Sequence, residues 1–149
     1  MNVKIIAKNK KARHLYHFLE SYEAGIQLLG TEVKSLRKGA VSIVEAYCKF
    51  IDGELYLLNA NIGQYSHGAQ WNHDPLRERK LLLHKSELIK IHQKVREKGL
   101  TVVPTVIYFN DSGIAKVEIV LAKGKKLYDR REDIIKREQE RRIRRKEDR

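Results

Sequence analysis

The chain has 149 residues, 31 Lys and Arg against 19 Asp and Glu, and a formal net charge of +12 at pH 7. This length fits one domain with, at most, a tail, and the 42% hydrophobic content is too high for a wholly disordered chain. No apolar run approaches the ~20 residues that span a bilayer, and the basic N-terminal segment lacks the apolar part of a signal peptide. The single cysteine, Cys48, excludes an intrachain disulfide and a multi-cysteine zinc site. The composition therefore predicts a soluble, cytoplasmic, strongly basic protein.

The positive charge lies almost entirely at the two ends of the chain. Residues 1–13 carry five basic and no acidic side chains, and residues 123–149 carry thirteen basic and seven acidic ones. Residues 14–122 have a net charge of only +1. A nearly neutral body with basic ends predicts that the body folds and that the ends bind polyanions. Solubility alone, the simpler explanation, does not require this segregation.

The segment 15–29 fits both a helix and a strand. Its apolar residues recur at helical spacing in the first half and alternate with period two throughout. The segment is rich in aromatic and branched residues, and Gly25 would weaken a helix, so we predict a strand that bends at Gly25. One face of that strand would hold Tyr16, Phe18, Tyr22, Ala24, Ile26 and Leu28.

A short helix and a hairpin are expected next. Thr31 is a candidate N-cap for a helix over 32–38, and Gly39 is typical of a residue that ends one. Asp52 and Gly53 form the turn pair that most strongly favours a tight hairpin. The strands of that hairpin would span 46–51 and 54–62.

The polar segment 63–78 is longer than an ordinary connection, which favours a functional loop. After it, Arg79–His84 has the apolar character of a strand. Ser86 is a candidate N-cap for a helix that runs to Lys98, and Gly99 would end it.

A second hairpin is expected over 100–110 and 114–122, around Asp111-Ser112-Gly113. Short strands joined by tight turns, with two or three helices, predict a mainly β fold. We expect a small antiparallel barrel with the helices packed outside it.

Residues 127–149 differ in character from this predicted barrel domain, residues 1–126. They contain too few apolar side chains for a core of their own, yet acidic residues precede basic ones at i, i+4 repeatedly, which favours a helix. We predict a tail that is disordered alone and becomes helical when a polyanion neutralises its arginines.

Signals of catalysis are weak. The sequence has no phosphate-binding loop, no dinucleotide motif and no zinc-protease motif. His67, His73 and Asp74 share a loop and leave open a metal site or a small RNA-processing enzyme, but no second carboxylate or cysteine supports a metal there. Cys48 fits a strand position better than it fits a nucleophile. We therefore expect no catalytic residues, no metal and no cofactor.

Signals of nucleic-acid binding are stronger. Three basic clusters, 9–14, 77–80 and 123–126, lie at the ends of predicted elements, where a barrel would bring them to one face. Lys and Arg neutralise phosphates, and Asn and His reach sugars and base edges. The candidate RNA-binding residues from the first and last clusters are Asn9, Lys10, Lys11, Arg13, His14, Lys123, Lys125 and Lys126.

Five motifs together resemble one bacterial family, the small protein B (SsrA-binding protein) family. They are Asn9-Lys10-Lys11-Ala12-Arg13-His14, Tyr22-Glu23-Ala24-Gly25-Ile26, Gly30-Thr31-Glu32-Val33-Lys34-Ser35-Leu36-Arg37, Arg79-Lys80-Leu81-Leu82-Leu83-His84 and Ala122-Lys123-Gly124-Lys125-Lys126. The resemblance implies an oligonucleotide-binding-like barrel that binds the tRNA-like domain of transfer-messenger RNA (tmRNA). It also implies delivery to stalled ribosomes in trans-translation, with the tail in the empty mRNA channel near the decoding centre.

The resemblance also implies roles for single residues. Asn9, Lys10, Glu23 and Leu82 match family positions linked to RNA binding, and so does His84, where one family member has Asn and where either side chain can donate to RNA. Glu23 would accept a hydrogen bond from a base or a 2′-hydroxyl, or instead serve local order. Leu82 would be either a contact or a core residue.

At the root of the tail, Tyr128, Asp129, Arg130 and Arg131 match the ribosome-binding segment of the family. Arg130 stands where the family usually has Lys; it keeps the positive charge but adds a planar guanidinium. No membrane partner and no small-molecule substrate are expected. The alternative within the binding class is a generic ribosomal or structured-RNA protein with the same barrel.

Overall fold

The computed structural model describes residues 3–66 and 72–125. The element order is β1 (Lys4–Lys8), α1 (Ala12–Leu15), β2 (Tyr16–Ile26), α2 (Gly30–Arg37), β3 (Val41–Ser42), β4 (Tyr47–Ile51), β5 (Glu54–Leu58), β6 (Asn61–Ile62), β7 (Arg79–Leu82), α3 (Lys85–Lys98), β8 (Thr101–Phe109) and β9 (Ala115–Gly124). The predicted mainly β fold is confirmed. Strand β1 and helix α1 have no counterpart in the sequence predictions.

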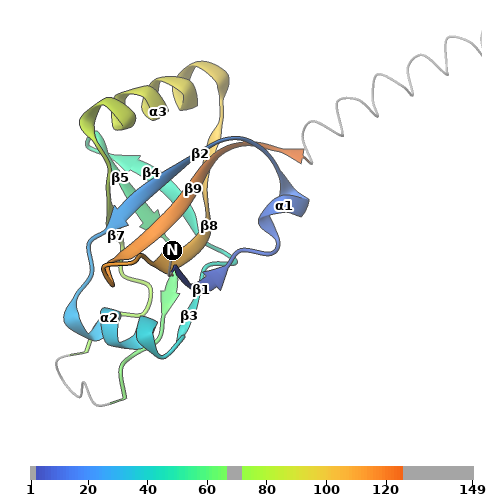
Figure 1. The fold of residues 1–149 in the computed structure, drawn as a ribbon. Helices are drawn as coiled ribbons and strands as arrows, with labels where there is room; N and C mark the ends of the chain where they lie inside the picture. Colours follow the sequence, from blue (N-terminus) through green and yellow to red (C-terminus); the bar gives the residue numbers. More distant parts are fainter. Residues whose placement is uncertain (1–2, 67–71, 126–149) are drawn as a thin grey trace, which may run out of the picture.

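Six antiparallel strands close into a barrel. The strand order is β1-β8-β4-β5-β7-β2-β9, and β9 pairs again with β8, which closes the ring and leaves β1 outside it on the edge of β8. Strands β3 and β6 form a separate two-stranded ladder. Figure 1 shows α2 and α3 at opposite ends of the barrel, with α1 beside the end of β9.

Side chains at alternate positions fill the barrel. In β9, Val117, Ile119 and Leu121 are buried inside, as the alternation of that strand predicts. Both predicted hairpins are present, and Asp52 and Gly53 of the first turn have the positive φ values, 51° and 79°, that such a turn requires.

Strand β2 is a strand, as predicted, but its apolar residues do not share one face. The register with β9 shifts between Phe18 and Glu20, so Leu19 is an extra residue in the strand. Tyr16 and Phe18 therefore pack outside the barrel, against a second apolar cluster, whereas Tyr22 packs against the main core. The predicted single face was wrong, because one inserted residue reverses the alternation.

Gly25, where we expected a bend, pairs with Lys116 of β9 on one side and with Leu82 of β7 on the other. A Cβ atom there would lie 3.2 Å from the Cβ of Leu82 on the neighbouring strand β7. Gly25 thus permits the close approach of the two strands.

Both predicted helix starts were two residues too late. Helix α2 begins at Gly30, and the carboxylate of Glu32 accepts a hydrogen bond from the backbone N–H of Leu29 at 2.7 Å, so Thr31 is not the N-cap. Helix α3 begins at Lys85, with His84 rather than Ser86 at the N-cap. In both cases a glutamate in the first turn satisfies the backbone ahead of the helix. Gly99 ends α3 in the left-handed conformation, as predicted.

The second strand of the first hairpin is shorter than predicted. Asn59 has a positive φ of 58°, which ends β5 and separates it from β6. Likewise β7 ends at Leu82, and His84 lies beyond it.

A buried ion pair fastens α2 to the barrel. Arg79 of β7 is wholly buried, and its Nε donates to the carboxylate of Glu32 at 2.5 Å. The guanidinium of Arg77 donates to the same carboxylate at 2.6 Å. Burial opposes ionisation of Glu32, but the hydrogen bonds from Arg77, Leu29 and Arg79 together lower its pKa. Arg79 also donates to the carbonyl of Ala60 at 2.9 Å, so it fixes the turn after β5.

Candidate nucleic-acid interface

The cluster 9–14 covers the short link between β1 and α1, residues 9–11, and the first three residues of α1. Ala12 is 1% exposed and anchors α1 on the outer apolar cluster formed by Val103, Val120 and Ala122. This anchor leaves the neighbouring cationic and polar side chains of the cluster exposed at the surface. They are Lys10, Lys11, Arg13 and His14.

The structure brings the described residues of the cluster 123–126 beside the cluster 9–14. Lys123 lies opposite His17 in the β2–β9 ladder, and the ammonium of Lys125 donates to the backbone carbonyl of Arg13 at 2.7 Å. We call the exposed side chains of residues 10–14, with Lys123 and Lys125, the α1 surface. Lys126 lies outside the described residues.

A cavity of about 440 Å³ opens beside the α1 surface, lined by Asn9, Lys10, Arg13, Phe18 and Glu118, among others. The guanidinium of Arg13 lies 5.8 Å from the centre of the Phe18 ring, within cation–π range. Cations, an aromatic ring and a carboxylate side by side suit a phosphate and the donor groups of a base.

Asn9 is 8% exposed and its backbone N–H donates to the carbonyl of Thr105 at 2.8 Å. Its side-chain N–H donates to the carbonyl of Pro104 at 3.1 Å, while its buried Oδ1 has no hydrogen-bond partner in the described structure. Asn9 thus holds the link against β8.

Glu23 lies on a different part of the barrel. It is exposed on β2, directly opposite Glu118 of β9, and its carboxylate accepts a hydrogen bond from the hydroxyl of Tyr108. A cavity of about 330 Å³ contains Glu23 together with Leu82, His84 and Lys116. These three family-matched positions, Glu23, Leu82 and His84, therefore share one surface. Sequence reasoning missed Tyr108, because 85 residues separate it from Glu23.

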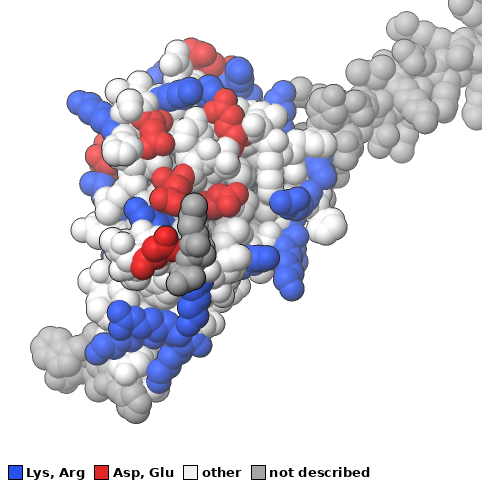
Figure 2. Space-filling view, in the orientation of Figure 1, with Lys and Arg blue, Asp and Glu red and all other residues white. Residues whose placement is uncertain are grey.

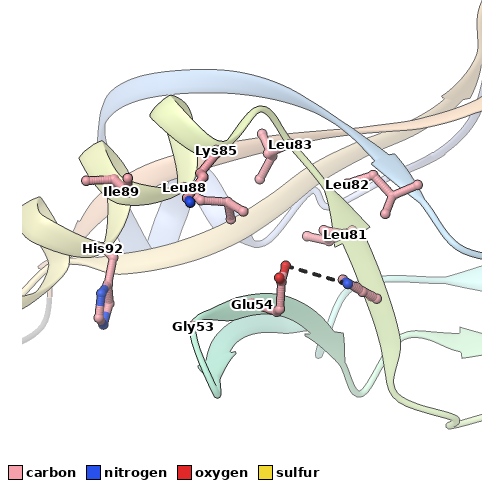
Figure 3. A pocket seen from close by; sticks show the side chains of 10 residues that line it. Gly53, Glu54, Leu81, Leu82, Leu83, Lys85, Leu88, Ile89 and His92 are labelled. Carbon is pink, nitrogen blue, oxygen red and sulfur yellow. Dashed lines mark ion pairs between the residues drawn. The ribbon is translucent and has the colours of Figure 1, made fainter.

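Leu82 is 51% exposed, which excludes the core position that the sequence left open. It also borders a third cavity of about 590 Å³, between β7, α3 and the turn after β4. Figure 3 shows Leu83, Leu88 and His92 around this cavity, with the ion pair between Glu54 and Lys80, 3.7 Å, at one side. This lining is largely apolar and does not resemble a phosphate site.

The third basic cluster, 77–80, does not join the α1 surface. Arg79 is buried and Arg77 is paired with Glu32, and Lys80 is paired with Glu54. The expectation that all three clusters reach one face was wrong, because one of them neutralises a buried carboxylate instead.

His73 is a structural residue in this fold. It is 3% exposed; its Nε2 donates to the carbonyl of Ile62 at 2.8 Å, and its Nδ1 lies 2.9 Å from the hydroxyl of Thr31. Both ring nitrogens are thus occupied. His67 lies outside the described residues. Within residues 3–66 and 72–125, no three His, Cys, Asp or Glu side chains form a group that would hold a metal.

Cys48 is buried in β4, and burial raises the pKa of its thiol. A buried thiol that keeps its proton is a packing residue and not a nucleophile. Among the described helices none is long and apolar enough to cross a bilayer. The expected ribosome-binding residues, Tyr128, Asp129, Arg130 and Arg131, lie outside the described part of the chain.

A closed antiparallel barrel with cations gathered beside a cavity defines a class of small, basic β-barrel proteins suited to nucleic acids. Comparison with known proteins gives the particular family. The family model described as SmpB protein matches residues 6–149, and this chain belongs to that family.

Relatives match over nearly the whole chain. The SsrA-binding protein of Thermosipho melanesiensis is 58% identical over 142 residues, 95% of this chain and 97% of that protein. The SsrA-binding protein of Moorella thermoacetica is 51% identical over 141 residues, 95% of this chain and 91% of that protein. A solved structure described as "tmRNA-SmpB: a journey to the center of the bacterial ribosome" contains a chain 57% identical to this one. The TM-score is 0.66, over 79% of this chain and 82% of that chain.

Proposed function

We propose that this protein is a tmRNA-binding adaptor of trans-translation. Its barrel binds the tRNA-like domain of tmRNA, and the complex is delivered to ribosomes stalled on messages that lack a stop codon. Family membership, the names of the relatives and the description of the matching solved structure support this proposal. The proposal places the protein in the bacterial cytoplasm, where ribosomes act.

The convergence of two distant basic clusters carries the proposal. The bond from Lys125 to the carbonyl of Arg13 joins residues 112 positions apart in the chain. Their cations lie beside a cavity with an aromatic ring, where a phosphate backbone and an unstacked base would be bound together. A folded RNA with exposed loop bases, such as a tRNA-like elbow, presents both groups.

The proposal includes a division of labour within the chain. Residues 1–126 form the tmRNA-binding domain, and residues 127–149 form a tail that becomes helical in the mRNA channel of the ribosome. Tyr128, Asp129, Arg130 and Arg131 would fix the root of that helix at the decoding centre. The ten basic side chains of residues 127–149, against seven acidic ones, support this assignment.

Competition binding tests the proposal against a generic RNA-binding barrel. A tRNA-like RNA domain and a duplex of equal charge compete for the full-length protein at moderate salt, where non-specific phosphate contacts are weakened. We expect the tRNA-like domain to bind about a hundredfold more tightly, or ~2.7 kcal/mol. Equal affinities would show a generic RNA-binding protein.

We also propose that the protein acts by binding and not as an enzyme. Incubating end-labelled tmRNA with the protein, with and without a chelator, tests this directly. We expect intact RNA in both samples, and cleavage that the chelator abolishes would show an RNA-processing enzyme.

A further inference from the structure

Strand β8 contains one extra residue beside the α1 surface. The register with β9 shifts between Pro104 and Val106, so Thr105 stands opposite no residue of β9. Pro104 has no N–H to donate to a ladder, which favours a bulge at this point. The hydroxyl of Thr105 donates to the backbone carbonyl of Glu118 at 3.2 Å, so β9 holds the bulge from one side. We call Pro104 and Thr105 the β8 bulge.

Asn9 holds the same bulge from the other side. Strand β1 pairs with β8 as far as Lys8 and Val106, and the backbone N–H of Asn9 then donates to the carbonyl of Thr105 at 2.8 Å. The side-chain N–H of Asn9 donates to the carbonyl of Pro104 at 3.1 Å. One residue therefore binds both carbonyls of the β8 bulge.

The carbonyl of Asn9 connects the β8 bulge to α1. It accepts a hydrogen bond from the backbone N–H of Ala12 at 3.3 Å, and Ala12 is itself anchored in the outer apolar cluster. The backbone of residues 9–12 is thus fastened at both ends. Lys10 and Arg13 line the cavity of about 440 Å³ beside the α1 surface. The fastened backbone therefore determines where these two cations enter the cavity.

The position of these cations matters because carboxylates lie close by. Figure 2 shows Lys and Arg side chains gathered over the region of α1, with Asp and Glu side chains over the strands β2 and β9. Glu118 of β9 lines the same cavity as Lys10 and Arg13. A cation that moved toward Glu118 would neutralise that carboxylate instead of a phosphate. A fixed backbone keeps both cations available to RNA.

Asn9 itself is badly placed to contact RNA. It is 8% exposed, its side-chain N–H is bound to Pro104, and its Oδ1 is buried. We infer that Asn9 is a positioning residue for tmRNA binding: it transmits the geometry of the β8 bulge to Lys10 and Arg13 and makes no contact with RNA. The inference rests on the proposed function, since it states how the α1 surface is held for that RNA. It gives a physical basis for the link to RNA binding that the family resemblance implies for Asn9.

A double-mutant cycle separates positioning from contact. Asn9→Ala is combined, in the full-length protein, with a cation variant that carries Lys10→Gln and Arg13→Gln. Affinity for tmRNA is measured by filter binding at several salt concentrations. Asn9→Ala alone should weaken binding about tenfold. In the cation variant it should cause less than about a twofold further loss, because no cations remain there to be misplaced.

The salt dependence of binding gives an independent readout. Asn9→Ala removes no charge, yet the slope of log affinity against log salt should decrease in magnitude by about one, because each lost phosphate contact removes close to one unit. A neutral amide that touched RNA would leave this slope unchanged when it is removed. Additive losses in the cycle would overturn the inference, and so would an unchanged slope or normal binding by Asn9→Ala.

Thr105 provides a second test that leaves Asn9 in place. Thr105→Val removes the hydrogen bond to Glu118 at nearly constant volume and should weaken tmRNA binding about threefold. Thr105→Ser keeps the hydroxyl and should bind more tightly than the Val variant. Thr101→Val, on the same strand but outside the β8 bulge, is the matched control and should bind as the unmodified protein does. Equal affinities of the two Val variants would overturn the inference.

Urea denaturation establishes that each variant is folded under the conditions of the binding assay. If Asn9→Ala does not fold, the Thr105 and Thr101 variants decide the question by themselves. Failure of the proposed function is a separate outcome, since the unmodified protein would then bind tRNA-like RNA and a duplex of equal charge with the same affinity.

Discussion

The hydroxyl of Tyr108, on β8, donates a hydrogen bond to the carboxylate of Glu23, on β2, across the intervening strand β9. Burial first, and then the neighbouring carboxylate, raises the pKa of Tyr108, so the hydroxyl keeps its proton at neutral pH. This bond restricts the position of a side chain that is otherwise exposed. It links the proposed RNA-binding role of Glu23 to a residue that is remote in sequence.

Replacing Tyr108 by Phe should weaken tmRNA binding about threefold, or ~0.7 kcal/mol, because Glu23 then adopts several rotamers. The free energy of unfolding should change by less than about 1 kcal/mol, since the ring stays in place. Filter binding and urea denaturation measure the two effects. Unchanged affinity would show that the contribution of Glu23 to tmRNA binding does not depend on the hydrogen bond from Tyr108.

Glu23→Gln tests the carboxylate itself. If the carboxylate accepts a hydrogen bond from RNA, the amide that replaces it accepts a weaker one. We therefore expect the Gln variant to bind tmRNA about tenfold more weakly, although it has lost a negative charge. A carboxylate that serves only local order would give equal or tighter binding, because a repulsion of phosphate is removed. Filter binding at two salt concentrations decides the sign, with circular dichroism as the control for folding.

Truncation after residue 126 tests the proposed division into body and tail. The barrel closes without residues 127–149, and the α1 surface lies entirely before them. The affinity for tmRNA should therefore stay within about tenfold, or ~1.4 kcal/mol, of the full-length value. A hundredfold loss would show that the tail takes part in binding tmRNA.

The tail prediction concerns residues outside the described part of the chain. Replacing Asp129, Arg130 and Arg131 by Ala should leave tmRNA binding intact but sharply reduce peptide tagging on stalled ribosomes. Lys136→Pro should have the same effect, because proline in a helix interior costs ~3 kcal/mol. Normal tagging by the proline variant would show that the tail acts as an extended basic segment.

The Glu32–Arg79 pair should make the stability of the barrel depend on pH. The folded-state pKa of Glu32 is lowered, so the stabilisation is complete above its unfolded pKa, roughly 4.3, and is lost as the pH falls through the folded value. Glu32→Gln leaves Arg79 buried without a counter-charge and should cost about 3 kcal/mol. Urea denaturation between pH 3 and pH 7, in steps of about one unit, measures both effects. A Gln variant as stable as the parent would contradict the prediction.

Local chemistry in the sequence determined several elements. The turn residues Asp52 and Gly53, and Gly99 after α3, act through φ preferences that depend on one or two residues, so both features were predictable. The alternation of β9 likewise gave its buried face. The family motifs and the segregated charge indicated an RNA-binding body before any contact was known.

Only the tertiary structure decided which distant residues meet. The extra residue Leu19 is defined by pairing with β9, and the burial of Arg79 depends on Glu32, 47 positions away. Nothing in the local pattern of either segment specifies its partner. The same reason applies to the bond between Lys125 and Arg13, which places the basic ends of the body side by side. The sequence by itself determined where the charge lies along the chain. Barrel closure decided which charges are exposed together, because burial and pairing depend on contacts between strands.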